Sequence, residues 1–152
     1  MSADRCIHDV IQDQARATPA AVALVAGGQQ ISYGELDARA NQLAHLLRSS
    51  GVGPDIPVGL YMQRSIDLAI GALGILKSGG AYVPLDPSYP VNRVSMLLED
   101  SGASLVVTQQ CLAARIPGGR WRSVVLDHDG LDSARYSRVR SPFSVPQLLQ
   151  RP

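Results

Sequence analysis

The chain contains the run Ile75-Leu-Lys-Ser-Gly-Gly-Ala-Tyr-Val-Pro-Leu-Asp-Pro-Ser-Tyr-Pro90, in which the end of an apolar helix passes almost directly into a short strand. Gly79 and Gly80 can both adopt the left-handed backbone that ends a helix, and the extended run 81–85 follows them. Pro84 has no amide hydrogen, so the strand is predicted to lie at the edge of a sheet or to leave the sheet there. The Asp-Pro and Tyr-Pro pairs then predict a rigid turn.

A helix and a strand are predicted immediately upstream of this run. The helix 66–78 follows from apolar residues that recur at intervals of three and four, namely Ile66, Ala69, Ile70, Leu73 and Leu76. Ser65 can cap its first turn. The short, largely apolar segment 57–62 predicts a strand, so the order is strand, helix, strand.

The alternation continues downstream. Apolar residues from Val91 to Leu98 recur with the period of a helix, and Gly102 ends it. The segments 104–108 and 123–126 predict two further strands. Strands that alternate with helices imply parallel pairing through right-handed crossovers. The predicted fold class is therefore α/β, an open, mainly parallel sheet with flanking helices.

The beginning of the chain predicts a helix and a hairpin. A short amphipathic helix starts near Ile7 and ends at Thr18-Pro19, because the residue before a proline is pushed out of helical geometry. Two antiparallel strands, 21–26 and 30–32, are predicted around Gly27-Gly28, where glycine permits the backbone of a tight turn.

A second helix, 33–50, is predicted to begin at a capping box. Ser32 and Glu35 have the spacing at which each side chain satisfies one of the unpaired amides at a helix start, and Gly51 ends the helix. The polar residues predicted to face away from its buried stripe are Asp37, Arg39, Gln42 and His45.

Composition limits the classes of function. The 152 residues, 45% of them hydrophobic, suffice for one ordinary domain with a core. A net charge of +1 disfavours nucleic-acid or membrane-surface partners, which bind strongly basic proteins. No apolar run approaches the roughly 18 residues that span a bilayer or resembles a signal peptide, so a cytoplasmic location is expected.

The end of the chain differs from the rest. No helical or alternating period survives after Gly130, and arginines dominate the charge: Arg135, Arg138, Arg140 and Arg151 stand against Asp132 alone. We therefore predict a folded part over residues 6–130 and a basic, disordered tail over 131–152. Cys6 and Cys111 fit neither a metal-binding spacing nor a disulfide framework, and are predicted to be reduced, structural thiols.

Two segments carry a resemblance to a known family. Ile31-Ser-Tyr-Gly-Glu-Leu36 and the run 75–90 together resemble the first two core motifs of nonribosomal peptide synthetase adenylation domains, which belong to the adenylate-forming, AMP-binding superfamily. The resemblance covers roughly residues 6–130 and implies an N-terminal subdomain, incomplete relative to the family. In this family the matching positions are structural supports, namely Tyr33, Glu35, Leu36, Leu76, Lys77, Gly79, Ala81, Tyr82, Val83, Pro84, Asp86, Pro87, Tyr89 and Pro90.

The resemblance implies chemistry for the parent family. Such an enzyme uses ATP and Mg²⁺ to convert an amino-acid carboxylate to an acyl-adenylate, and passes the acyl group to a phosphopantetheine thiol. The family's phosphate loop, its adenine and ribose motifs, its hinge and its catalytic lysine would all lie downstream of this chain. We therefore expect no catalytic, cofactor-binding or metal-binding residue in the chain itself. The glycine pairs beginning at 27, 79 and 118 lack a phosphate loop's lysine and hydroxyl.

Several single residues allow two interpretations. Lys77 could contact phosphate, but a lysine in the last turn of a helix is already favoured by the helix dipole. Arg64 and Ser65 follow a strand where ligands of open sheets bind, although capping is also consistent. Tyr82 and Asp86 are predicted to be packing and turn residues. Two histidines and the tryptophan carry no functional prediction: His8 and His128 lack metal partners at ligand spacing, and Trp121 is isolated.

Three functions remain open on this reasoning. The first is a truncated adenylation domain without activity of its own. The second is a non-catalytic module that completes or binds another synthetase polypeptide, or binds a small accessory protein of the MbtH-like kind. The third is a complete small nucleotide-binding α/β protein. A partial sheet should expose an apolar face and an open edge, so poor solubility is also expected.

Overall fold

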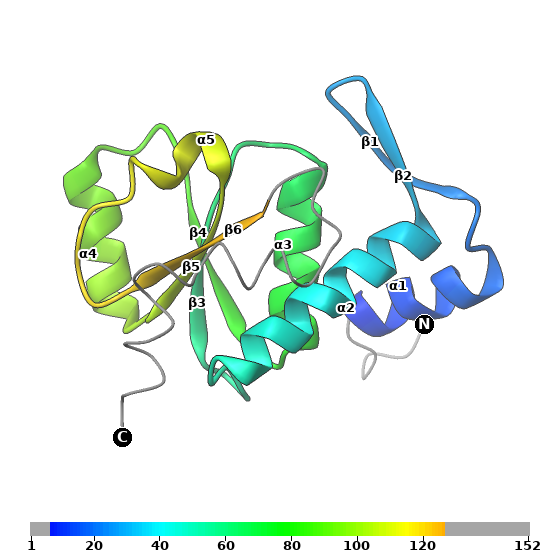
Figure 1. The fold of residues 1–152 in the computed structure, drawn as a ribbon, viewed down its shortest axis with the longest axis horizontal. Helices are drawn as coiled ribbons and strands as arrows, with labels where there is room; N and C mark the ends of the chain where they lie inside the picture. The colour runs from blue at the N-terminus through cyan, green and yellow to red at the C-terminus, as the bar shows by residue number, and fades with distance from the viewer. Residues whose placement is uncertain (1–6, 127–152) are drawn as a thin grey trace.

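A parallel sheet of four strands forms the centre of the molecule (Figure 1), in a computed structural model that describes residues 7–126. The strands lie in the order β4-β3-β5-β6 and pair in parallel throughout. They are β3 (Pro57–Tyr61), β4 (Ala81–Leu85), β5 (Leu105–Gln109) and β6 (Arg122–Leu126). The predicted α/β class with a parallel sheet is confirmed. The segment 131–152, Cys6 and His128 lie outside the described residues.

Helices cover both faces of this sheet. On one face, α2 (Tyr33–Ser49) and α3 (Ile66–Lys77) share an apolar core with alternate residues of β3, β5 and β6. On the other, α4 (Val91–Ser101) and the single turn α5 (Gln110–Ala113) enclose a second core that includes Trp121. The first helix, α1 (Ile7–Ala17), packs against α2 (Figure 1). Within residues 7–126, none of the helices combines the length and the apolar character needed to cross a bilayer.

The predicted hairpin is present beside this core. β1 (Val22–Ala26) and β2 (Gln29–Ser32) pair antiparallel, and Gly27 and Gly28 between them have φ values of 58° and 78°. Ser32 then caps α2, because its Oγ accepts a hydrogen bond of 3.2 Å from the amide of Glu35. The carboxylate of Glu35 instead accepts a 2.9 Å bond from Arg39. The serine half of the predicted capping box is therefore the half that forms.

Gly79 and Gly80, at the α3–β4 junction, meet two different structural requirements. Gly79 has φ of 92°, as predicted for a helix end. Gly80 does not have a positive φ, which corrects the prediction. A Cβ at this position would instead lie 2.9 Å from the carbonyl oxygen of Ile56 and 2.9 Å from Val52 Cγ1. Close approach of backbone therefore requires the second glycine.

Strand β4 forms one edge of the sheet, as Pro84 predicts. The amide of Ala81 donates to Ile56 O at 2.9 Å, which directs the backbone groups of Ala81 towards β3. Because these groups alternate along a strand, those of Val83 also point towards β3, whereas those of Tyr82 and Pro84 point to the open edge. Proline thus occupies a position where no sheet hydrogen bond is lost.

Three side chains of α2 contradict the sequence prediction. Asp37, Arg39 and Gln42 are half-buried rather than facing away, whereas His45 is exposed as predicted. The reason is that α1 and α3 both pack beside α2, which widens its buried face beyond the apolar stripe.

Gly74→Ala is expected to lower the free energy of unfolding by about 1–2 kcal/mol. The new Cβ would lie 2.5 Å from Cδ2 and 2.9 Å from Cβ of Leu43 on α2, and overpacking of this kind outweighs the roughly 1 kcal/mol gained in helix propensity. Urea denaturation of the purified chain measures the change. Gly53→Ala is the control, because a Cβ there meets nothing within 4 Å. Equal stability of the two variants would contradict close α2–α3 packing.

Candidate functional site

The order of the strands reverses at the carboxyl ends of β3 and β5. The chain runs from β3 through α3 to β4, and then returns through α4 to β5 on the other side of β3. In open α/β sheets, ligands bind outside the carboxyl ends of the strands at such a switch point. The candidate site is therefore the loop 62–65 together with the end of β5.

A network of hydrogen bonds closes the switch point. The hydroxyl of Thr108 donates to Tyr61 O at 2.7 Å. The side-chain amide of Gln109 accepts a 3.0 Å bond from the backbone amide of Gln63 and donates to Ser65 Oγ at 3.4 Å. Gln109 thus ties the end of β5 to the start of α3. The sequence analysis did not predict this role of Gln109. The only indication in the sequence is that a polar residue follows an apolar strand.

Ser65 is a helix cap in the structure. Its Oγ accepts a 3.3 Å bond from the amide of Leu68 and donates to Gln63 O at 3.0 Å. The capping interpretation of Ser65 is confirmed. The adjacent Arg64 is exposed and lines a groove beside the switch point.

This groove has a volume of about 1290 Å³ and lies between the β1–β2 hairpin, α3, β4 and the turn after β4. Its floor is apolar, and its polar groups gather at the carboxyl end, where Arg64, Arg115 and Asp86 lie. The guanidinium of Arg115 donates to Pro87 O at 2.8 Å. The apolar lining residues include Leu24, Val25, Leu68, Ala69, Ala72, Tyr82 and Pro84.

Asp86 organises the turn at the carboxyl end of this groove. Its Oδ1 accepts bonds of 2.9 Å from both the amide and the hydroxyl of Ser88. These two bonds, the backbone one first, lower the pKa of the exposed Asp86 carboxyl below its ordinary value. The prediction that Asp86 is a turn residue is confirmed. Tyr82, predicted to be a packing residue, is instead 43% exposed in the groove.

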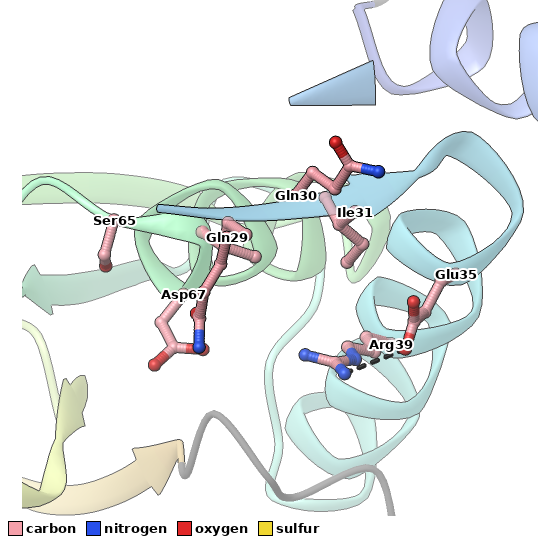
Figure 2. A pocket seen from close by; sticks show the side chains of 8 residues that line it. Gln29, Gln30, Ile31, Glu35, Arg39, Ser65 and Asp67 are labelled. Atoms are coloured by element: carbon pink, nitrogen blue, oxygen red, sulfur yellow. Dashed lines mark hydrogen bonds and ion pairs between the residues drawn. The ribbon is translucent and has the colours of Figure 1, made fainter. Parts of the chain in front are cut away.

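A second, polar hollow of about 430 Å³ lies beside β2 and the starts of α2 and α3. Figure 2 shows the side chains of Gln29, Arg39 and Asp67 around it, with Arg39 bonded to Glu35 at 2.9 Å. The mixture of two carboxylates with one guanidinium does not select ligands of either charge. We therefore assign no ligand class to this hollow.

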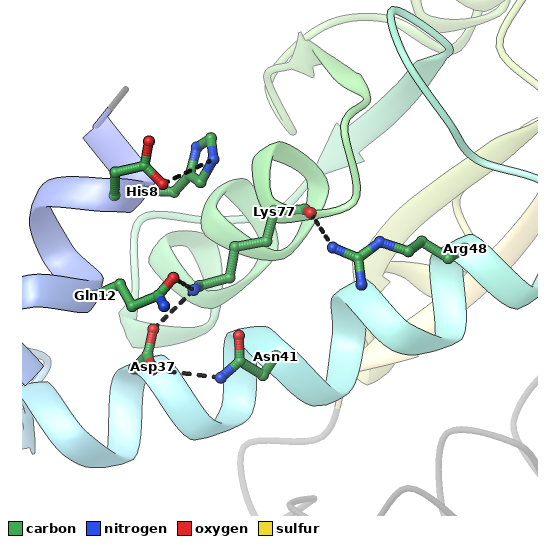
Figure 3. Close-up of polar contacts among 7 residues, drawn as sticks. His8, Gln12, Asp37, Asn41, Arg48 and Lys77 are labelled. Carbon is green, nitrogen blue, oxygen red and sulfur yellow. Dashed lines mark hydrogen bonds and ion pairs between the residues drawn. The ribbon is translucent and has the colours of Figure 1, made fainter. Parts of the chain in front are cut away.

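Lys77 lies far from the carboxyl edge, because α3 ends where β4 begins. Figure 3 shows its Nζ between α1 and α2, 2.8 Å from Asp37 Oδ1 and 3.3 Å from Gln12 Oε1. The side chain of Lys77 is 5% exposed and that of Asp37 17%. Arg48 donates to Lys77 O at 2.5 Å and so caps the end of α3. The contacts of Lys77 are those of an internal ion pair.

The structure separates the remaining family-motif residues into three places. Tyr33, Glu35 and Leu36 form the first turn of α2, Leu76 and Gly79 lie at the end of α3, and the others follow in β4 and its turn. The last group consists of Ala81, Tyr82, Val83, Pro84, Asp86, Pro87, Tyr89 and Pro90, the last being the residue before α4. Tyr82, Pro84, Asp86, Pro87 and Tyr89 of the last group line the groove, whereas Glu35 lines a separate polar hollow.

Of the residues without a functional prediction, His8 and Trp121 do not line this groove. His8 Nε2 lies 3.7 Å from Asp9, and residues 7–126 hold no group of three or more potential metal ligands. Trp121 is buried in the α4 core, and its indole donates to Pro117 O at 2.7 Å. Cys111 is a free thiol, as expected, but it is exposed and therefore not a packing residue.

The doubly wound sheet, with its groove at the carboxyl edge, defines a class of α/β proteins that bind ligands at that edge. The chain belongs to the AMP-binding enzyme family, whose profile matches residues 11–145. This membership confirms the resemblance found in the two sequence motifs.

The similar proteins include two bacterial synthases. Gramicidin S synthase 2 of Brevibacillus brevis is 46% identical over 113 residues, which are 74% of this chain and 2% of that protein. Zwittermicin A synthase ZmaJ of Bacillus cereus is 43% identical over 131 residues, which are 86% of this chain and 24% of that protein. The chain therefore spans only a small part of these relatives.

Solved structures agree with the fold. The nonribosomal peptide synthetase FmoA3 superposes with a TM-score of 0.73 at 39% identity, over 80% of this chain and 13% of that one. The N-terminal subdomain of Klebsiella oxytoca NpsA superposes with a TM-score of 0.71 over 90% of this chain and 34% of its own, and at 23% identity it supports the fold alone.

Lys77→Met is expected to lower the free energy of unfolding by about 2–4 kcal/mol, because Asp37 would keep a largely buried carboxylate without its cation. Adding Asp37→Leu should recover part of this loss. Glu35→Gln is the control, since the side chain of Glu35 is 44% exposed and its pair with Arg39 should contribute less than about 1 kcal/mol. Chemical denaturation of all four proteins tests this, and a loss for Lys77→Met no larger than the control's would contradict it.

Ser88→Ala is expected to raise the pKa of Asp86 only part of the way to its ordinary value, because the stronger bond from the Ser88 amide remains. NMR titration of the Asp86 carboxyl carbon measures this, with the remote Ser49→Ala as control. The folded pKa is the lower one, so the stabilisation by this turn is present above the unfolded pKa and is lost as pH falls through the folded pKa. A pKa unmoved by Ser88→Ala would rule out the hydroxyl contribution.

Proposed function

We propose that the chain forms the N-terminal wall of an amino-acid adenylation domain of a nonribosomal peptide synthetase, and that it does not activate amino acids alone. The observation that carries the proposal is the 39% identity and TM-score of 0.73 shared with the synthetase FmoA3. FmoA3 has been solved with AMPPNP and with α-methyl-L-serine-AMP bound. The parent reaction is ATP-dependent formation of an aminoacyl-adenylate and transfer to a phosphopantetheine thiol. We assign this reaction to the parent enzyme on the basis of the similarity.

The chemistry of that reaction explains why we assign the chain a supporting role. A substrate carboxylate must attack a triphosphate, and both are anions, so a site needs backbone amides, a metal ion and a cation near the developing charge. At the switch point, the amides of Gln63 and Leu68 are already bonded to side chains. Gly79 joins a helix to a strand, the reverse of the strand-to-helix order of a phosphate loop.

The residues of the described chain therefore do not fit ATP with Mg²⁺. Asp67 stands in the first turn of α3, where its negative charge would oppose a phosphate group. Residues 7–126 contain no cluster of three His, Cys, Asp or Glu side chains for a metal ion. We derive no catalytic step from this chain, and we assign ATP, Mg²⁺ and the phosphopantetheine carrier to the parent enzyme, with a cytoplasmic location.

A second candidate is a non-catalytic module that binds another synthetase polypeptide or an MbtH-like accessory protein. The exposed apolar groove beside α3 favours it, since such a surface usually marks an interaction site. A pull-down with the tagged chain from its source cells distinguishes the two candidates. Recovery of a synthetase component supports the module, and recovery of none counts against it.

Amino-acid-dependent pyrophosphate exchange tests the absence of activity. The purified chain is expected to give exchange at the level of a heat-denatured sample, because the amides and charges at its switch point do not suit a triphosphate. FmoA3 under the same conditions is the positive control. Robust, ATP-specific turnover would refute the supporting role. Calorimetric binding of ATP or AMP would instead favour a complete small nucleotide-binding protein.

A further inference from the structure

A further hollow, of about 450 Å³, lies at the amino ends of β5 and β6. Ser104, just before β5, and Trp121, just before β6, line it together with the last turn of α4. Because the strands are parallel, this is the opposite end of the sheet from the switch point. The volume falls within the roughly 300–1,000 Å³ of small-molecule sites, so the hollow is large enough for a small metabolite.

The apolar wall of this hollow is held in place by the chain around it. Ala103 and Trp121 form this wall, and both are buried. The indole of Trp121 donates to Pro117 O at 2.7 Å, and its ring packs so closely on Gly119 that a Cβ there would clash with it. Because these two contacts fix the ring, the wall can accept an apolar group without rearranging.

Two exposed side chains of opposite charge line the same hollow, Glu99 in the last turn of α4 and Arg120 in the loop before β6. Within residues 7–126, neither of them has an ion-pair partner. The helices α1, α2 and α3 each carry a basic residue in the last turn, whereas α4 carries none. The carboxylate of Glu99 thus adds to the negative end of the α4 dipole and attracts a cation, while Arg120 offers a guanidinium to an anion.

We propose that this hollow binds a free α-amino acid with an apolar side chain. The ammonium group would lie at Glu99, the carboxylate at Arg120, and the side chain against Trp121. Such a zwitterion complements both charges, whereas a simple ion complements one and a residue within a polypeptide has lost both. The hydroxyl of the half-buried Ser104 is available for a further hydrogen bond. The inference does not rest on the proposed function.

Fluorescence of Trp121 tests the proposal, because this residue is the only tryptophan of the 152-residue chain and lies in the hollow itself. The probe is L-phenylalanine, titrated into the full chain under selective excitation of tryptophan. A saturable change in emission is expected. Phenethylamine lacks the carboxylate of the probe and 3-phenylpropionate lacks its ammonium group. Each should bind at least about fivefold more weakly, because one charged contact is lost.

Two variants assign the charges. Glu99→Gln and Arg120→Gln should each weaken phenylalanine binding at least about fivefold. Arg120→Gln should leave phenethylamine binding unchanged, since that ligand has no carboxylate. The matched controls are Asp100→Asn and Arg16→Gln, exposed residues that do not line the hollow, and they should bind as the unchanged chain does.

Three results would overturn the proposal. The first is the absence of a saturable change at millimolar phenylalanine, and the second is binding that both Glu99→Gln and Arg120→Gln leave intact. The third is equal affinity for phenylalanine and 3-phenylpropionate, which would show that the hollow does not recognise an ammonium group. Circular dichroism of each variant establishes that a loss of binding is not a loss of fold.

Discussion

The embedding of α3 is the constraint on which the rest of the structure depends. This helix approaches β3 and α2 so closely that a side chain at Gly71 or Gly74 would displace a leucine. A Cβ at Gly71 would lie 2.7 Å from Leu60 on β3, and one at Gly74 would lie 2.5 Å from Leu43 on α2. The crossover from β3 to β4 is therefore fixed by contact on two sides. The hairpin and α1 also pack against α3.

The charges at the end of α3 fix how the surrounding helices meet it. Lys77 extends from α3 to Asp37 of α2 and Gln12 of α1, and so links three helices through one ammonium group. A buried ion pair is a weak source of net stability, because both ions lose their hydration. Removing one partner is nevertheless costly, because the other ion would then remain buried without its counter-charge.

The sequence predicts those features that depend on local chemistry. Pro84 marks the sheet edge, Gly102 ends α4 with φ of 76°, and Ser65 caps α3, each through an effect confined to a few neighbouring residues. Features that depend on distant neighbours escape prediction. Asp37 is half-buried because α3 lies beside it, and Gln109 reaches the loop after β3 only because β5 pairs with β3. The short α5 has too few residues to show a period.

The carboxyl edge of the sheet bears on the supporting role that we propose for this chain. At a switch point, unpaired amides at a helix start would normally be available to an anion. Here Ser65 takes the amide of Leu68, Gln109 takes that of Gln63, and Asp67 adds a negative charge to the same turn. The open space lies instead beside the switch point and is apolar. The proposed supporting role is consistent with this arrangement, in which the amides of Leu68 and Gln63 already have partners.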